Sequence, residues 1–511
     1  MHQTPMRQPH RLSVFLMIVV AMSYPLVVQA MPESFIVEYA VRFGKYDKRA
    51  YTYVEGLLHG TIDRPDGSID HYSTPVVLMY PDKKKDGNGF GWVDIPTTSY
   101  FLLYPNAFCK EASPPCPTSE IGRRPEDQIS QGARLFSEDF LFRQGYVYMS
   151  IQYNKYITDN FGPEPPASAD KHPPNTGKQR SLAYGTIAHG IDAYTILQDA
   201  SLFLRNPGSM FHAGKGKKVK PPHAVEHVLA AGWSHAAWFA RAFLKEGYNR
   251  SANGAPFFDG MLHIASGRQC RPALDESPYI PSTPTSLTCV GAPTFQDQLD
   301  GKLIVVQTET NFSNFSADQA RDADPQHPSY RVYEVAGVAH IPQPVQDVAW
   351  LGAFRQNPTD ARPFVRAAIN HLHDWISEGK NPPASVYVDG QRTTSGWVFS
   401  TDTDGNTTGG IRPPSMPSMT PAGEPAGAPT GVYGGTDATF FPSGNLGPAF
   451  GGTYTPFSDE ELARRYPTED VYLELVTRAA DQLLQDGYIL QEDRDLYIIE
   501  AGGDPGKKGH P

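Results

Sequence analysis

The chain has 511 residues, of which 40% are hydrophobic and 19% are charged. This composition is typical of a globular protein with a sizeable core and excludes an intrinsically disordered chain. The formal net charge is −11, from 44 basic and 55 acidic residues. It argues against a nucleic-acid partner, which would require a basic surface. The basic run Lys215–Lys220 is interpreted as a solvated loop.

The first thirty residues have the pattern of a secretory signal peptide. Arg7 and Arg11 give a basic start, Leu12–Val28 is apolar, and Val28-Gln29-Ala30 resembles a cleavage site. A retained membrane anchor is the alternative, because the apolar stretch is about long enough to span a bilayer. The sequence therefore predicts an exported protein, secreted or periplasmic, with no stable membrane insertion after residues 1–30 are removed.

The chain contains four cysteines, Cys109, Cys116, Cys270 and Cys289. An even number of cysteines in an exported protein is typical of disulfide bonds. Proximity in the sequence favours pairing Cys109 with Cys116 and Cys270 with Cys289, although three pairings are open. None of the four has the spacing of a metal site or lies in a catalytic-cysteine signature. No metal is therefore expected.

The residues after the predicted signal peptide have a pattern of strands and turns. Two stretches rich in proline or charge, 105–127 and 158–178, are predicted to be surface insertions. Four strands are expected ahead of the first insertion, at 34–43, 51–62, 74–80 and 88–95.

From residue 131 onward, helical patterns alternate with short apolar strands. This order predicts a mostly parallel sheet flanked by helices, because helices that join parallel strands make right-handed crossovers. The helices are expected at 131–144, 187–204, 235–246 and 363–377, and the strands at 146–152, 225–231, 261–266, 303–308 and 330–336.

The junction of one such strand and helix carries a serine, in Ala230-Ala231-Gly232-Trp233-Ser234-His235-Ala236. This arrangement is typical of a nucleophile elbow, in which a strained turn lifts the serine hydroxyl out of the sheet edge. The residues two before and two after the serine must be small, and here they are Gly232 and Ala236. A serine that caps the helix is the alternative. We interpret Ser234 as the nucleophile, with the N–H of His235 directed at a developing oxyanion.

A serine nucleophile requires a base, and the base requires an acid that orients it. After such an elbow the acid comes first in the chain and the histidine second. Glu309 is the first acid after the predicted strand 303–308, and the later Asp318 is the alternative. His340 follows the strand 330–336 through a turn of small residues and is the predicted base.

Three other histidines compete with His340 for the role of base. His235 is next to the serine, but an elbow directs neighbouring side chains apart. His263 lies within a predicted strand and is interpreted as structural. His327 is the third, and of all these histidines His340 alone has the expected order and setting.

The second oxyanion donor is expected in the loop after the strand 88–95. Pro96 has no N–H, so Ile95 or Thr97 must donate if this loop forms the oxyanion hole. Trp233, beside the serine, and Tyr153, after the strand 146–152, are candidates for the lining of a substrate pocket.

These segments resemble those of the large α/β-hydrolase domain proteins found mainly in bacteria and fungi. The resemblance implies an α/β-hydrolase fold with the two insertions. It also implies that residues 401–511, a loop-rich segment with helices at 458–466 and 468–487, wrap a catalytic domain of residues 31–400. The similar segments are the serine elbow, Thr308-Glu309-Thr310-Asn311, Glu334–His340, Asp404–Pro414, Thr455-Pro456-Phe457, Tyr466-Pro467, Asn88-Gly89, Tyr184-Gly185 and Asp259-Gly260.

The chain departs from the family pattern at two places. His235 and Ala236 stand where relatives more often carry Gln and Ser or another small residue. Asn311 stands where relatives tend to carry an acid. Glu309 is retained, and it is therefore favoured as the acid.

The sequence thus predicts an exported serine hydrolase that cleaves a small-molecule carboxylic ester through an acyl-enzyme, without metal or organic cofactor. The same triad can also catalyse acyl transfer or amide hydrolysis. A non-catalytic binding protein on a hydrolase fold is the alternative from another class, and Asn311 is the feature that supports it.

Overall fold

The structure is a computed structural model, and it describes residues 31–63, 69–95, 139–151, 190–214, 218–267, 299–315, 317–322, 324–340, 357–394, 396–435 and 451–506. The predicted signal peptide, the four cysteines and the insertions at 105–127 and 158–178 lie outside these residues. No helix within the described ranges combines the length and apolarity needed to cross a membrane.

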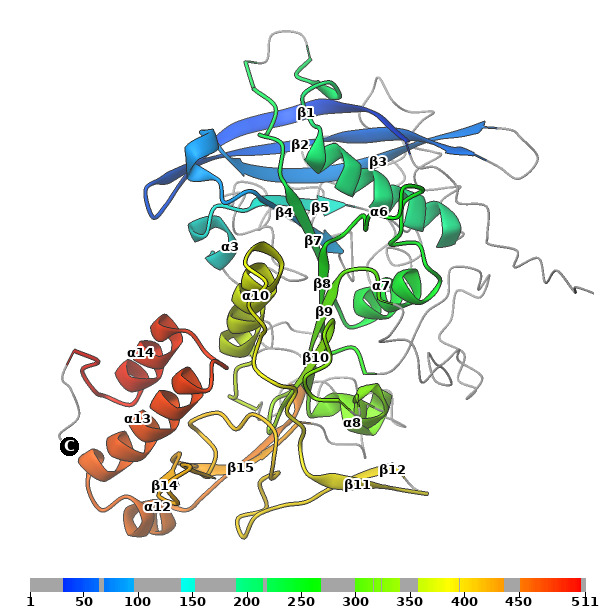
Figure 1. Ribbon diagram of the computed structural model, residues 1–511. Helices are drawn as coiled ribbons and strands as arrows, with labels where there is room; N and C mark the ends of the chain where they lie inside the picture. The colour runs from blue at the N-terminus through cyan, green and yellow to red at the C-terminus, as the bar shows by residue number, and fades with distance from the viewer. Residues whose placement is uncertain are drawn as a thin grey trace, which may run out of the picture.

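A ten-stranded sheet runs through the centre of the described structure (Figure 1). Its strands are β1 (Met31–Tyr46), β2 (Arg49–Asp63), β3 (Ile69–Pro81), β4 (Phe90–Ile95), β5 (Val147–Ile151), β6 (Phe211–His212), β7 (His227–Trp233), β8 (Gly260–Ile264), β9 (Lys302–Thr308) and β10 (Tyr330–Val335). They lie side by side in the order β10-β9-β8-β7-β4-β5-β3-β2-β1-β6.

Neighbouring strands pair in parallel along one part of the sheet, which consists of β10, β9, β8, β7, β4 and β5. The strands β3, β2 and β1 form an antiparallel extension, in which β3 pairs with β5. The mostly parallel sheet predicted from the sequence is therefore confirmed. The parallel strands are buried along almost their whole length. This burial explains their continuous apolar runs, since both faces of a parallel sheet are covered.

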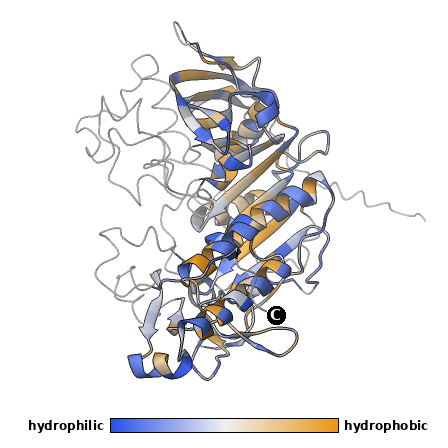
Figure 2. Cartoon of the chain, turned by 90° about the vertical axis from the view of Figure 1, so that its left-hand side faces the viewer, coloured by the Kyte–Doolittle hydropathy of each residue, from blue (hydrophilic) through white to orange (hydrophobic). Residues whose placement is uncertain are grey.

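Helices cover both faces of the parallel part of the sheet. The helices α6 (Gly190–Arg205) and α7 (His235–Lys245) pack on one face, and α3 (Phe140–Arg143) and α10 (Arg362–Ser377) pack on the other (Figure 1). Figure 2 shows hydrophobic residues along the strands and hydrophilic residues on the outward sides of the helices. Each helix thus buries one apolar stripe against the sheet.

The C-terminal part of the chain packs against the sheet edge at β10. Isolated bridges join Tyr333 to Val386 and Val335 to Ile411, on either side of the boundary predicted at residue 400. The short elements of this part are β11 (Gly390–Thr393), β12 (Gly396–Phe399), β13 (Ser418–Met419), β14 (Pro425–Ala426), β15 (Gly431–Gly434), β16 (Thr453–Pro456), α12 (Asp459–Arg465) and α13 (Glu469–Gln485).

A last helix, α14 (Gln491–Glu500), was not predicted from the sequence. Its N-cap is Leu490, which lacks the side-chain oxygen by which most helix starts are recognised. The Asp493 carboxylate instead accepts the N–H of Leu490 at 3.1 Å. The start of α14 therefore depends on a residue inside the helix, which sequence patterns do not reveal.

A buried ion pair joins α14 to α10. Arg366 Nε donates to Asp493 Oδ1 at 2.9 Å, and the two side chains are 5% and 0% exposed. Removing one partner leaves the other charge buried without compensation. We expect Arg366→Ala to lower the free energy of unfolding by about 3–5 kcal/mol, measured by urea denaturation.

The matched control is Arg464→Ala, which removes an ion pair from Glu461 within α12. Arg464 is 70% exposed, so solvent screens the pair. Its loss should cost less than about 1 kcal/mol. Equal losses in the two variants would contradict a structural role for the buried pair.

Candidate active site

Ser234 occupies the turn between β7 and α7 with strained backbone angles. Its φ is 57° and its ψ is −122°, which is a conformation that residues other than glycine rarely adopt. Two backbone hydrogen bonds hold it there. The N–H of Ser234 donates to the carbonyl of Ile264 at 2.9 Å, and the N–H of Trp238 donates to the carbonyl of Ser234 at 3.1 Å. The turn therefore has the geometry of a nucleophile elbow.

The residues that flank the serine leave no room for larger side chains. A Cβ atom added to Gly232 would lie 2.7 Å from the carbonyl carbon of Ala236 and 2.7 Å from the backbone nitrogen of Ala237. Ala236 is itself fully buried. The small residues expected around the serine are thus required because α7 passes directly over the end of β7.

His340 lies opposite Ser234 on the loop that follows β10. Its Nε2 is 2.9 Å from Ser234 Oγ, a hydrogen-bonding distance, and both residues are buried. The indole of Trp233 lies beside the imidazole, with the ring centroids 5.4 Å apart, and Trp233 Nε1 donates to the carbonyl of His340 at 3.3 Å. Trp233, which was expected to line a substrate pocket, thus contacts His340.

Glu309 follows β9 directly and is 5% exposed. Its Oε2 accepts the N–H of Gly337 at 2.6 Å, and its Oε1 accepts the N–H of Gly435 at 3.0 Å. Burial raises the pKa of Glu309, and hydrogen bonds from Gly435, Gly337 and the Thr407 side chain oppose that rise. The sequence predicts a hydrogen bond between the Glu309 carboxylate and His340. Among the described residues, the hydrogen bonds of this carboxylate go to other groups.

The other polar residues near the end of β9 have different partners. Asp318, the alternative acid, is bound by the Arg392 guanidinium of β11, with Nε 2.7 Å from Oδ2. Asn311 is fully buried, and its Oδ1 accepts the hydroxyl of Thr308. Within the described part of the chain, Asn311 Nδ2 has no hydrogen-bond partner. Because its side chain is a neutral amide, Asn311 brings no negative charge to the end of β9.

The remaining candidates fall into three groups. Ile95 ends β4 in register with Gly232, and His235 is the first residue of α7. Thr97 and Tyr153 lie outside the described residues. His263 is buried in β8, where burial and the charge of Arg241 lower its pKa well below the ordinary value. His263 is therefore a neutral core residue, in keeping with its structural interpretation.

Sequence reasoning missed two residues that hold the loop of His340. The Thr310 hydroxyl accepts the N–H of His340 at 2.9 Å, and it donates to the carbonyl of Gly435. Thr310 stands beside Glu309 in a motif that the sequence singled out, so its signal was available. Gly435 is 125 residues away from Thr310, and no local pattern indicates that contact.

Several solved structures resemble parts of the chain. A rice cell wall degrading esterase from Xanthomonas oryzae is 11% identical, with 47% of this chain and 51% of that chain covered and a TM-score of 0.23. A putative dienelactone hydrolase from Klebsiella pneumoniae is 8% identical, with 63% and 99% covered and a TM-score of 0.27. A CE15 glucuronoyl esterase from Teredinibacter turnerae is 10% identical, with 55% and 62% covered and a TM-score of 0.25.

These likenesses are too distant to carry an argument about activity, and the chain spans only about half the length of the esterase from Xanthomonas oryzae. No curated protein matches the sequence. The model of the family described as "Alpha/beta hydrolase domain" matches residues 131–498. The match includes the elbow, the end of β9, the loop of His340 and most of the C-terminal part. The chain therefore belongs to the α/β-hydrolase domain family.

Proposed function

We propose that the protein is a serine hydrolase that cleaves a carboxylic ester through an acyl-enzyme formed on Ser234. The observation that carries the proposal is the 2.9 Å distance between Ser234 Oγ and His340 Nε2 at a strained turn between strand and helix. A hydroxyl and an imidazole at this distance can exchange a proton. A serine that only capped the helix would not require the positive φ.

In the first half of the reaction, Ser234 Oγ attacks the ester carbonyl while its proton passes to His340 Nε2. The carbonyl oxygen gains negative charge, which the N–H of His235 and a second N–H from Ile95 or Thr97 are proposed to stabilise. The intermediate then collapses. The bond to the alcohol oxygen breaks, and His340 returns the proton to the leaving alcohol.

In the second half, water attacks the acyl-enzyme. His340 takes a proton from the water, and the tetrahedral intermediate releases a carboxylic acid and Ser234 Oγ, which regains its proton. An alcohol or amine in place of water would give acyl transfer. Hydrolysis of a small-molecule ester outside the cytoplasm is the version proposed here, with export directed by residues 1–30.

Glu309 is proposed to support the base by holding its loop, because both carboxylate oxygens accept backbone N–H groups. Glu309→Ala would leave two buried N–H groups unsatisfied, at about 1–3 kcal/mol each. We expect it to lower kcat for p-nitrophenyl acetate roughly 10–100-fold, through displacement of the base. Asp318→Ala should change kcat by less than about twofold, because the pair it breaks, with Arg392, is partly exposed and does not include His340.

A fluorophosphonate probe tests the proposed function directly, since it phosphonylates an activated serine and leaves ordinary serine hydroxyls unmodified. The wild-type protein should be labelled, and so should Ser377→Ala, which removes an exposed hydroxyl from α10. Ser234→Ala should not be labelled. If the folded wild type resists the probe and hydrolyses no p-nitrophenyl ester, the proposed function is contradicted and the non-catalytic alternative on a hydrolase fold is favoured.

A further inference from the structure

Glu309 and Thr310 hold the loop that carries His340 at three points. The N–H of Gly337 donates to Glu309 Oε2 at 2.6 Å, and the N–H of Glu309 donates to the carbonyl of Val338 at 3.0 Å. The N–H of His340 donates to Thr310 Oγ1 at 2.9 Å. The backbone of the loop is therefore fixed at its start, its middle and the histidine itself.

The same two residues bind Gly435 through both of its backbone polar groups. Glu309 Oε1 accepts the N–H of Gly435 at 3.0 Å, and the Thr310 hydroxyl donates to the carbonyl of Gly435. A hydroxyl has one proton and two lone pairs. Donation to Gly435 therefore directs a lone pair of Thr310 toward the N–H of His340. The Thr310 hydroxyl therefore connects Gly435 to His340 through two successive hydrogen bonds.

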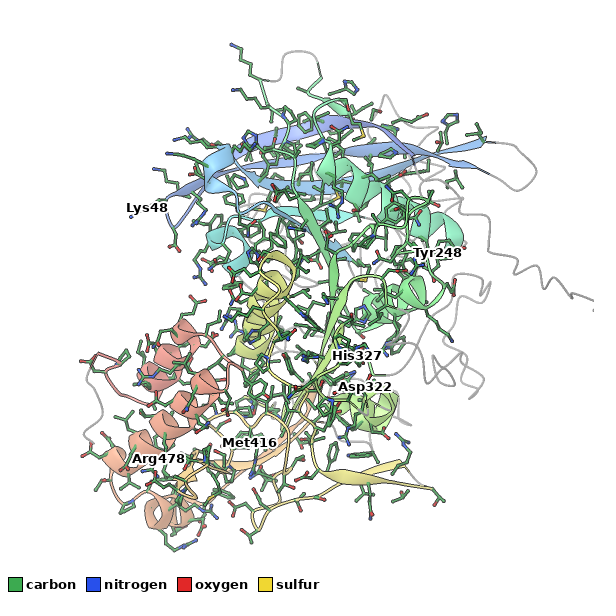
Figure 3. All side chains as sticks on the ribbon, in the orientation of Figure 1. Lys48, Tyr248, Asp322, His327, Met416 and Arg478 are labelled. Carbon is green, nitrogen blue, oxygen red and sulfur yellow. The ribbon has the colours of Figure 1, made fainter. Side chains whose placement is uncertain are left out.

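Other contacts bring the C-terminal part of the chain against the same loop. Asn357 Nδ2 donates to the carbonyl of Gly337 at 2.7 Å and to that of Gly434 at 2.9 Å. Gly337 has a φ of 67°, and a Cβ added to it would lie 2.5 Å from Met416 Sδ. Met416 is labelled in Figure 3, where it lies below the end of the sheet at β10. The loop is thus enclosed between β9 and the residues that follow position 400.

Gly435 itself fits this position only as glycine. A Cβ at residue 435 would overlap the Cβ of Glu309 and would lie 2.7 Å from the backbone nitrogen of Thr310. The φ of Gly435 is not in the left-handed region, so space and not backbone conformation sets the requirement. A larger residue would push the backbone at position 435 away from the Glu309 carboxylate and the Thr310 hydroxyl.

We propose that residues 431–435 form a positioning element for His340, acting through the Thr310 hydroxyl. The inference rests on the proposed function, in which His340 is the general base. The acceptor atom of a base must lie within about 2.6–3.2 Å of the atom that carries the proton it removes. A displacement of about 1 Å can cost roughly 100-fold in rate. Thr310 and Gly435 are positioning residues, since neither is placed to contact the reacting atoms.

The test compares Thr310→Val, which removes the hydroxyl, with Thr310→Ser, which keeps it, and with Gly435→Ala. We expect Thr310→Val and Gly435→Ala to lower kcat for p-nitrophenyl acetate about 10–100-fold with KM changed by less than about threefold. Thr310→Ser should stay within about threefold of wild type. The control Thr468→Val removes the N-cap hydroxyl of α13 and should lower stability without changing kcat.

Two further measurements separate positioning from a loss of folded protein. In Thr310→Val, kcat should fall while circular dichroism reports the same folded fraction as wild type, whereas partial unfolding would lower kcat and the folded fraction together. Hydrogen exchange of peptides covering residues 336–340 and 431–435 should become faster in both Thr310→Val and Gly435→Ala.

The outcomes distinguish this inference from the proposed function. Unchanged exchange of the 336–340 peptide in both variants would overturn the anchoring of the loop, whatever the activity. Faster exchange with wild-type kcat would overturn the positioning role. Full activity of Ser234→Ala would instead overturn the proposed nucleophile, and hydrogen exchange would still decide whether Thr310 and Gly435 hold the loop.

Discussion

Replacing His340 with alanine is expected to lower kcat for p-nitrophenyl acetate by roughly 10⁴–10⁶-fold. The reason is geometric. His340 Nε2 is 2.9 Å from Ser234 Oγ, and without it the hydroxyl keeps its proton and remains a weak nucleophile. KM should change by less than about threefold, because the histidine acts on the transition state more than on bound substrate. Steady-state kinetics on purified protein give both values.

The control for this prediction is His212→Ala, which removes an exposed histidine from β6 at the far end of the sheet. It should keep the wild-type kcat and the wild-type reaction with the fluorophosphonate probe. Comparable activity of His340→Ala and His212→Ala would contradict the role of His340 as base. Circular dichroism of both variants establishes that the folded state is being compared.

A methyl group at position 232 should disrupt the elbow. In Gly232→Ala the new Cβ would lie 2.7 Å from two backbone atoms of α7, and real Cβ atoms do not approach backbone so closely. Either α7 moves away from β7 or Ser234 leaves its strained conformation. We expect the free energy of unfolding to fall by at least about 1–3 kcal/mol and kcat to fall by at least about 100-fold.

Gly208→Ala provides the matched control, because a Cβ at residue 208 meets no atom within 4 Å and the residue has no positive φ. Thermal unfolding and esterase kinetics should be close to wild type for this variant. If Gly232→Ala behaved like Gly208→Ala in both measurements, the packing of α7 over the end of β7 would not be what holds Ser234 in place.

The pairing of Ser234 with His340 could be anticipated because its signals are local. The elbow is recognised from small residues at fixed steps around a serine between a strand and a helix. The histidine is recognised from its place after the last core strand. The structure brings these two residues within hydrogen-bonding distance. Parallel strands end at one edge of a sheet, so chain order alone predicts that residues after such strands meet.

The contacts of the Glu309 carboxylate could not be anticipated in the same way. Chain order places Glu309 at the end of β9, but it does not specify which way a side chain turns. In the structure its carboxylate turns to the backbone of Gly337 and Gly435. Asp318, the alternative acid further along the chain, is bound by Arg392 of a hairpin that no motif indicated.

The amino-acid sequence by itself determined most of the strands and helices as far as α10, the mostly parallel sheet and the serine between β7 and α7, because periodicity and steric limits act over a few residues. The tertiary structure decided how the loop of His340 is held. Gly435 contacts Thr310 across 125 residues. Such a contact depends on the path of the whole chain between the two residues. It also involves backbone groups, which nearly every residue carries, so no residue type in the sequence indicates it.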